Sequence, residues 1–188
     1  MQALLMALET AAFFLIGAAL LRIWLVWVGL SLAVQPGRFV TALTEWLVQP
    51  LRRLLPAGMG RGRLDTVVLV AAMVLALAYA GLWYALILQA GAATAGAGWV
   101  LAIPVLAARM LLKVLLQGVF YLVLAYAVMS WVQPQSPVLY TLARLLEPLL
   151  SPIRRWVPLL GGVDLSPLVL ILATQALQIL LLERGWRG

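Results

Sequence analysis

The sequence predicts an all-α polytopic membrane protein of two parallel repeats, with about four transmembrane helices and additional interfacial amphipathic helices. Three observations predict this fold class. Hydrophobic residues make up 65% of the 188 positions and charged residues only 10%, far from the balance of a soluble domain. Long apolar stretches recur along the chain. A motif of prolines, paired arginines and acids also occurs twice, about a hundred residues apart.

The first two apolar stretches are each long enough to cross the membrane once. The first, about 11–33, carries Arg22. The second, about 66–88, has no charge and places Ala72, Ala76 and Ala80 at four-residue spacing. Such a ridge of small side chains lets another helix approach closely. A helix of roughly 20 apolar residues spans the ~30 Å hydrocarbon layer.

The third apolar run, 99–132, is too long for one straight span and holds Pro104 and Lys113. We therefore predict a span at about 114–132. An interfacial or broken segment at 99–112 precedes it, with Lys113 reaching to the membrane boundary. The fourth span, about 167–182, is short. We find no acid inside these four spans.

The basic residues gather in two connections, 36–64 and 134–164. They are Arg38, Arg52, Arg53, Arg61 and Arg63 in the first, and Arg144, Arg154 and Arg155 in the second. With four crossings both connections lie on one side of the membrane, and the positive-inside rule makes that side cytoplasmic. Both termini then face outward. A fifth crossing near Trp99 would change this topology.

Each basic connection contains a candidate amphipathic helix. In the second, the apolar side chains that share one helical face are Val138, Leu139, Leu142, Leu145, Leu146 and Leu149. In the first, the corresponding set is Phe39, Val40, Leu43, Trp46 and Leu47, with Arg38, Thr41 and Thr44 opposite. Both patterns favour helices that lie in the membrane interface.

The two halves of the chain align as an internal duplication. The aligned residues are Trp27 with Trp131, Glu45 with Glu147, Pro50 with Pro152, Arg52-Arg53 with Arg154-Arg155, Pro56 with Pro158, and Asp65 with Asp164. We predict a first repeat at 1–90, a linker with the interfacial or broken segment at 91–112, and a second repeat at 113–188. Equal crossings per repeat make the two repeats parallel.

Prolines and glycines predict the shape of the second basic turn. Pro152 and Pro158 limit the helix around the arginine pair to about one turn, and Gly161-Gly162 can turn the chain back to the membrane. Ser166 is a plausible N-cap of the last span, followed by a proline at the first helical position. Asp164 is favoured near that helix start and can pair with Arg154 or Arg155.

The composition argues against most catalytic and cofactor chemistry. The chain has no Cys and no His, which removes thiol nucleophiles, the commonest general base and the usual metal or haem ligands. We therefore predict no enzyme activity, cofactor or metal. The charge excess of thirteen Arg and Lys over six Asp and Glu suits an anionic membrane surface, with no direct binding of nucleic acid.

Three strings carry a resemblance to a known family: Leu21-Arg-Ile-Trp24, Met129-Ser-Trp131 and Glu147-Pro-Leu-Leu-Ser-Pro-Ile-Arg-Arg-Trp-Val-Pro-Leu-Leu-Gly-Gly-Val-Asp-Leu-Ser-Pro167. They closely resemble the YggT family of small bacterial membrane proteins. This family is called YlmG in Gram-positive bacteria, cyanobacteria and plastids. The resemblance implies a two-repeat protein of the inner membrane, with links to osmotic stress, potassium uptake and cell division, and in plastids to nucleoid distribution and cytochrome assembly. No enzymatic activity goes with the family.

This sequence departs from the motif in its first half. The acid Asp65 is followed by Thr66 and lacks the Ser-Pro of the second copy, and Tyr126 stands where the first copy has Arg22. We therefore expect the two repeats to contribute unequally to any site.

Two interpretations stay open for each polar feature. Arg22 is either an ion or substrate site or, if its helix starts near Leu4, a partner of a loop acid or lipid phosphate. The arginine pairs bind either anionic lipids or a protein partner. The polar stripe of Thr174, Gln175 and Gln178 lines a pore or makes interhelical hydrogen bonds.

From these features we predict a non-catalytic assembly or scaffold factor involved in osmotic stress or ion homeostasis. Its partners are anionic lipids and other membrane proteins or copies of itself. The residues assigned to its two loops are Arg52, Arg53, Glu45 and Asp65, and Arg154, Arg155, Glu147 and Asp164. The alternative is a small oligomeric channel or transporter component for potassium or an osmolyte, with Arg22, Gln175 and Gln178 along the pathway.

Overall fold

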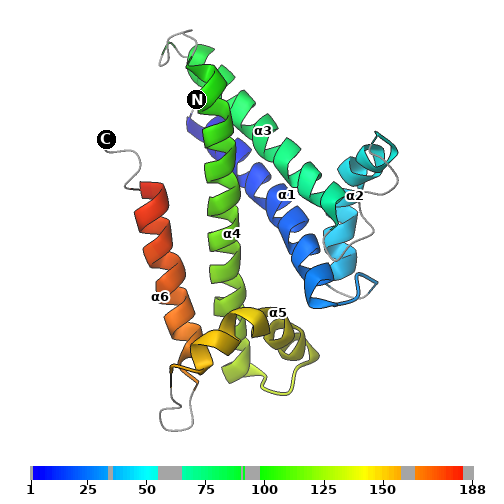
Figure 1. Cartoon of the computed structure of the whole chain (residues 1–188), viewed down its shortest axis with the longest axis vertical. Helices are drawn as coiled ribbons and strands as arrows, with labels where there is room; N and C mark the ends of the chain where they lie inside the picture. The colour runs from blue at the N-terminus through cyan, green and yellow to red at the C-terminus, as the bar shows by residue number, and fades with distance from the viewer. Residues whose placement is uncertain are drawn as a thin grey trace. The chain divides into compact units, whose positions relative to one another are not determined.

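The computed structural model describes residues 2–33, 36–54, 65–89, 91, 98–157 and 164–183. All regular secondary structure in these ranges is helical. The helices, in chain order, are α1 (Gln2–Val28), α2 (Gly37–Leu54), α3 (Thr66–Gln89), α4 (Trp99–Val132), α5 (Pro137–Arg154) and α6 (Ser166–Gln178), and a π-helical turn, η1 (Ile179–Glu183), follows α6 (Figure 1).

Three helices are long and apolar enough to cross a membrane: α1, α3 and the Val100–Val132 part of α4. The segment Ser166–Leu182 is a shorter apolar helix, about 25 Å long at 1.5 Å per residue, against ~30 Å for the hydrocarbon layer. The chain is therefore a helical membrane protein. Four crossings and a parallel arrangement of two repeats stay predictions.

By its internal packing the chain divides into two compact units, Met1–Val114 and Leu115–Gly188, with the boundary inside α4. In the first unit α1 packs along α3, and α2 packs against both. Small side chains make this packing possible, because Ala72, Ala76 and Ala80 of α3 are completely buried. The predicted close approach at this alanine ridge is confirmed.

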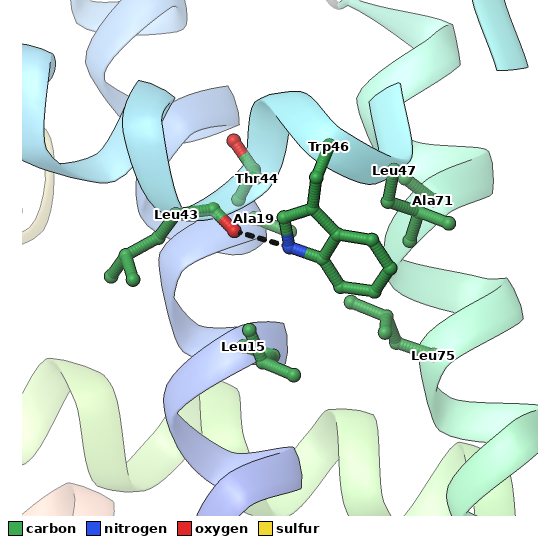
Figure 2. A pocket seen from close by; sticks show the side chains of 8 residues that line it. All are labelled: Leu15, Ala19, Leu43, Thr44, Trp46, Leu47, Ala71 and Leu75. Atoms are coloured by element: carbon green, nitrogen blue, oxygen red, sulfur yellow. Dashed lines mark hydrogen bonds between the residues drawn. The ribbon is translucent and has the colours of Figure 1, made fainter. Parts of the chain in front are cut away.

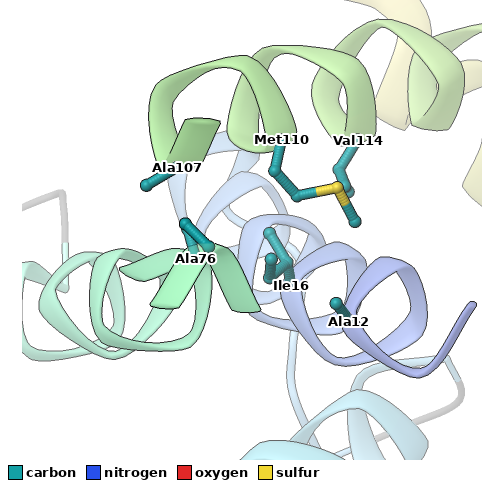
Figure 3. Packing of buried hydrophobic residues seen from close by; sticks show 7 residues of the cluster. Ala12, Ile16, Ala76, Ala107, Met110 and Val114 are labelled. Atoms are coloured by element: carbon teal, nitrogen blue, oxygen red, sulfur yellow. The ribbon is translucent and has the colours of Figure 1, made fainter. Parts of the chain in front are cut away.

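The first part of α4 adds to the same core. Figure 3 shows side chains of the cluster where α1, α3 and α4 meet: Ala12, Ile16, Ala76, Ala107, Met110 and Val114. Gly17 of α1 faces this helix, since a Cβ atom there would lie 3.5 Å from Val114 Cγ1. The first unit is thus a bundle in which short side chains bring α1 into van der Waals contact with α4.

The second unit consists of the later part of α4, α5 and α6. Here α5 lies across the ends of α4 and α6 (Figure 1), around a core cluster of Val123, Leu146, Leu150 and Leu170. Ser136 caps α5, because its hydroxyl accepts a hydrogen bond from Val138 N at 3.2 Å, and a proline occupies the first helical turn.

The first apolar helix is longer than predicted. It begins at Gln2 and ends at Val28, whereas we expected a span from about Ala11 to Ala33. The extra residues at its start include Glu9, so this acid belongs to the helix. Arg22 lies near the C-terminal end of α1 and not at its middle.

The predicted break in the segment 99–112 is wrong. α4 is one continuous helix from Trp99 to Val132 that contains Pro104. A proline this close to the start of a helix removes only one backbone donor, which would have bonded to the carbonyl of Val100, and the helix continues beyond it. An interfacial position for this segment stays a prediction.

The prediction of a separate one-turn helix around the second arginine pair is wrong. α5 continues through Pro152 to Arg154, and α2 continues in the same way through Pro50. A proline in the last turn costs one intrahelical hydrogen bond, and buried side chains such as Leu150 hold that turn in place. Pro158 and Gly161-Gly162 lie outside the described residues.

The start of α6 also differs from the prediction. Ser166 is the first helical residue, and the N-cap position belongs to Leu165, which makes no side-chain capping bond. The cap comes from one residue earlier, because Asp164 Oδ1 accepts the hydrogen bond of Ser166 N at 2.9 Å. The predicted N-cap at Ser166 is therefore wrong.

The face of α2 that packs on α1 and α3 contains Val40, Thr44 and Val48, each at most 4% exposed. Phe39 and Trp46 are 59% and 58% exposed, although the predicted apolar face included both. Thr44, which we placed opposite the apolar side chains, lies on the packed face, and an interfacial position of α2 stays a prediction. The hydroxyl of Thr44 faces the bundle because it binds Arg22.

The alanine ridge of α3 gives a test of this packing. Ala76→Leu places a larger side chain where no space exists, so we expect a loss of about 1–3 kcal/mol in unfolding free energy. The control is Ala78→Leu on the exposed side of the same helix, with an expected change within about 0.5 kcal/mol. Thermal unfolding in detergent, followed by circular dichroism, measures both. Equal effects of the two changes would contradict the packing of α3.

Candidate functional site

Arg22 is a buried arginine that joins α1 to α2. Only 4% of the residue is exposed, and its Nη1 donates to Thr44 Oγ1 and to Glu45 Oε2, both at 2.9 Å. Thr44 in turn donates to the carbonyl of Val40. The carboxylate of Glu45 neutralises a charge that would be costly without a partner. Of the two interpretations of Arg22, this contact matches the pairing with an acid of the first basic connection.

A recess lies beside this contact, between α1, α2 and α3. Figure 2 shows its lining residues: Leu15, Ala19, Leu43, Thr44, Trp46, Leu47, Ala71 and Leu75. The indole Nε1 of Trp46 donates to the carbonyl of Leu43 at 2.8 Å, so this polar atom is already used. The lining offers hydrocarbon almost throughout, which suits packing and gives no set of groups for chemistry on a substrate.

The first basic turn is closed by an ion pair between Arg52 and Asp65. Arg52 lies in the last turn of α2, and Asp65 directly precedes α3, where its carbonyl accepts hydrogen bonds from Val68 N and Leu69 N. A cation at a helix C-terminus and an anion at a helix N-terminus both interact favourably with the helix dipoles. The pair therefore links the end of one helix to the start of the next.

In the second basic turn Arg154 makes the equivalent contact and two more. Its Nε donates to Asp164 Oδ2 at 2.8 Å, and its Nη1 donates to Glu147 Oε2 at 3.2 Å. Its Nη2 lies 3.5 Å from the hydroxyl of Tyr126. One arginine thus connects α4, α5 and the residue before α6.

The pKa values of this pair follow from its contacts. Burial alone would raise the pKa of Asp164, but hydrogen bonds from Ser166 and Arg154 outweigh it, and the pKa lies below its usual 3.8. Burial would likewise lower the pKa of Arg154, whereas Asp164, Tyr126 and Glu147 raise it above its usual value. Both groups therefore stay charged at neutral pH, and the ion pair persists.

The two basic turns differ because Tyr126 stands beside the second, whereas Arg22 stands beside the first. In the first, Glu45 binds Arg22 and Asp65 binds a separate arginine. In the second, a tyrosine cannot neutralise Glu147, so Arg154 binds both acids of its turn. The expected inequality of the two halves takes this form: two arginines serve two acids in one repeat, and one arginine serves two acids in the other.

The second arginine of each pair has a different environment. Arg53 and Arg155 are exposed, and neither forms an ion pair with another residue in the described ranges. Large apolar side chains follow them directly, with Leu54 80% exposed and Trp156 87% exposed. Each turn therefore presents one guanidinium and one apolar side chain that the rest of the described chain does not cover.

The residues of the predicted polar stripe lie in α6, where their contacts differ. The hydroxyl of Thr174 donates to the carbonyls of Leu170 and Ile171, within α6. Gln178 Nε2 is buried and has no hydrogen-bond partner among the described residues. Arg61 and Arg63 lie outside the described ranges.

Our sequence analysis missed one pair of charged residues. Lys113 of α4 donates to Glu9 Oε1 of α1, although we expected Lys113 to reach to the membrane boundary. We counted no acid inside a span because we began the first span after Glu9. The sequence did contain a signal for this pair. Glu9 is a single acid near an apolar stretch, and Lys113 in another apolar stretch is its candidate partner.

The structure offers no grouping for a metal: in the described ranges no three His, Cys, Asp or Glu side chains come together. What the site can do is bind charge at two turns and pack helices.

The two glutamates at equivalent positions provide a matched test. Glu45→Gln leaves the buried Arg22 without a counter-charge, so we expect a loss of about 3 kcal/mol in unfolding free energy. Glu147→Gln removes an acid whose side chain is 57% exposed and whose arginine keeps Asp164, so we expect about 1 kcal/mol or less. Thermal unfolding in detergent measures both losses. A larger loss for Glu147→Gln would overturn the assigned pairs.

Comparison with known proteins identifies the family. The family model described as CCB3/YggT matches residues 1–86 and 105–184. The chain is 34% identical over 154 residues to "Uncharacterized protein YggT" of Escherichia coli (strain K12), which covers 81% of this chain and 75% of that protein. It is 33% identical over 159 residues to "Uncharacterized protein in proC 3'region" of Vibrio alginolyticus, which covers 83% of this chain and 80% of that protein. No solved structure matches the chain. The chain belongs to the CCB3/YggT family.

Proposed function

We propose that this protein is a non-catalytic scaffold or assembly factor of the bacterial inner membrane. Its two basic connections, 36–64 and 134–164, face the cytoplasm and bind anionic lipids and other membrane proteins. A role in osmotic stress or ion homeostasis follows from the family resemblance. The proposal concerns binding, and no substrate or cofactor enters it.

One observation carries the proposal: the two arginines of each pair have different contacts. Arg154 is used within the fold, where it binds Asp164 and Glu147. Arg155 is exposed and has no ion pair with the described residues. A guanidinium beside an exposed tryptophan supports an interaction with an anionic partner, because arginine binds carboxylates and phosphates in a fixed geometry. In the first turn Arg53 has the equivalent position, beside the exposed Leu54 in place of a tryptophan.

The geometry of the turn favours specific binding over loose attraction to lipid. The ion pair of Arg154 with Asp164 joins the end of α5 to the residues before α6, so the backbone next to Arg155 is restrained. Restraint lowers the entropy that a partner must overcome on binding. Anionic headgroups still contribute, at about 1 kcal/mol for each arginine near the surface.

The alternative of a channel or transporter component has one observation in its favour, because Glu9 places an acid within an apolar helix. The lack of an acid inside a span therefore no longer argues against a channel. However, Glu9 is paired with Lys113 and Arg22 is paired with Glu45, so neither charge is free to hold a passing ion. Potassium or osmolyte flux in proteoliposomes that contain only this protein, abolished by Gln178→Leu, would support the alternative.

A photoreactive amino acid at position 156 tests the scaffold proposal in living cells. We expect it to capture a defined membrane protein, and we expect Arg155→Gln to reduce this capture about tenfold, as loss of a charged contact does in other interfaces. The readout is the crosslinked band and its identification by mass spectrometry.

The matched control is Arg144→Gln, which removes one exposed positive charge from the same helix and should leave the capture unchanged. Equal losses from the two changes would show general attraction to the membrane surface. Capture of lipid alone, or capture that persists in Arg155→Gln, would contradict the scaffold proposal.

A further inference from the structure

The charged pair Glu9–Lys113 lies at the end of the first unit away from the basic turn. Lys113 Nζ donates to Glu9 Oε1, and the pair joins α1 to α4. The side chain of Lys113 is 43% exposed and that of Glu9 is 42% exposed. The pair therefore lies on the surface of the bundle, and the proposed function makes no use of it.

Its depth follows from its distance to Arg22 along α1. Arg22 contacts the amphipathic helix α2, so it marks the level of one membrane boundary. Glu9 lies about 20 Å from that level along the helix, at 1.5 Å per residue. Since the hydrocarbon layer is ~30 Å thick, Glu9 and Lys113 lie about 10 Å inside the opposite boundary.

An ion pair at this depth has hydrogen-bonding groups that hydrocarbon cannot satisfy. An ammonium group has three donors, and a carboxylate can accept several hydrogen bonds. The structure shows one hydrogen bond between Lys113 and Glu9, and large parts of both side chains face outward. Charged groups inside the membrane face protein or water and not lipid tails. Water or a polar partner of no net charge is therefore needed on this surface, and we develop the case of a partner.

A second copy of the chain fulfils this requirement. Two copies with the same orientation in the membrane, related by a twofold axis along the membrane normal, present the pair at the same depth. The axis brings Glu9 of each copy toward Lys113 of the other, so the surface is complementary to itself. Met6 lies one turn from Glu9 on the same face of α1 and is 67% exposed, which adds an apolar contact.

We propose that the Glu9–Lys113 surface of α1 and α4 is a homodimer interface within the membrane, in which the two ion pairs of two copies form one four-charge cluster. The interface is distinct from the basic turns. Its failure would leave the scaffold proposal intact, and failure of the scaffold proposal would leave the dimer intact.

Complementary charge reversal tests the interface. The chain has no native cysteine, so Met6→Cys is a single reporter for disulfide crosslinking in isolated membranes. We expect crosslinked dimers of the reporter chain. In this background Glu9→Lys alone or Lys113→Glu alone brings like charges together and should lower the dimer at least about tenfold.

Co-expression distinguishes an interface from a contact within one chain. When differently tagged Glu9→Lys and Lys113→Glu chains are mixed, each copy carries two like charges, and opposite charges meet only between copies. We expect the mixed dimer to form at the level of the reporter chain. The double variant Glu9→Lys with Lys113→Glu, in one chain, should dimerise with itself.

Three results would overturn the proposal. The first is an unchanged dimer in the neutral variant Glu9→Gln with Lys113→Met, which leaves no unpaired charge and should fold as a monomer. The second is a mixed pair that does not crosslink although the double variant does. The third is a reporter cysteine that crosslinks to a different protein and not to a second copy.

Discussion

The ion pair between the first arginine of each basic turn and the acid before the next helix is the contact on which the arrangement of each repeat depends. Arg52–Asp65 and Arg154–Asp164 each join a helix C-terminus to a helix N-terminus, where the dipoles favour these charges. The pair holds α2 against α3 in the first turn and α5 against α6 in the second. The pair also determines which arginine of each turn remains exposed, because the arginine that binds the acid is no longer available to a partner.

The two basic turns are held by different contacts. In the first repeat Arg22 reaches from α1 to Glu45, and the turn arginine has only Asp65 to bind. In the second, Tyr126 stands in that place, and Arg154 binds Glu147 as well. Loss of the acid costs more where the remaining arginine is buried, as Arg22 is, because its charge has no access to water. The first repeat is therefore the more sensitive to loss of its glutamate, although the two turns have similar sequences.

Much of this could be predicted from the sequence. Apolar stretches and the repeated Pro-x-Arg-Arg motif predicted the helices and the residues of both turns, because composition and local spacing determine them. Helix ends were less predictable. Glu9 was left outside the first predicted span, whereas it belongs to α1 and pairs with Lys113 of α4. Thr44 was assigned to the polar side of α2, whereas the structure buries it against Arg22. Both errors concern contacts between distant helices, whose register local patterns do not contain.

A double-mutant cycle tests the central pair most directly. The unfolding free energies of Arg154→Gln, Asp164→Asn and the double variant should be non-additive by at least about 0.5 kcal/mol. The parallel cycle of Arg155→Gln with Asp164→Asn should be additive within about 0.3 kcal/mol. This result would establish that the first arginine closes the turn and the second remains outside. Coupling of Asp164 to Arg155 in place of Arg154 would contradict the account.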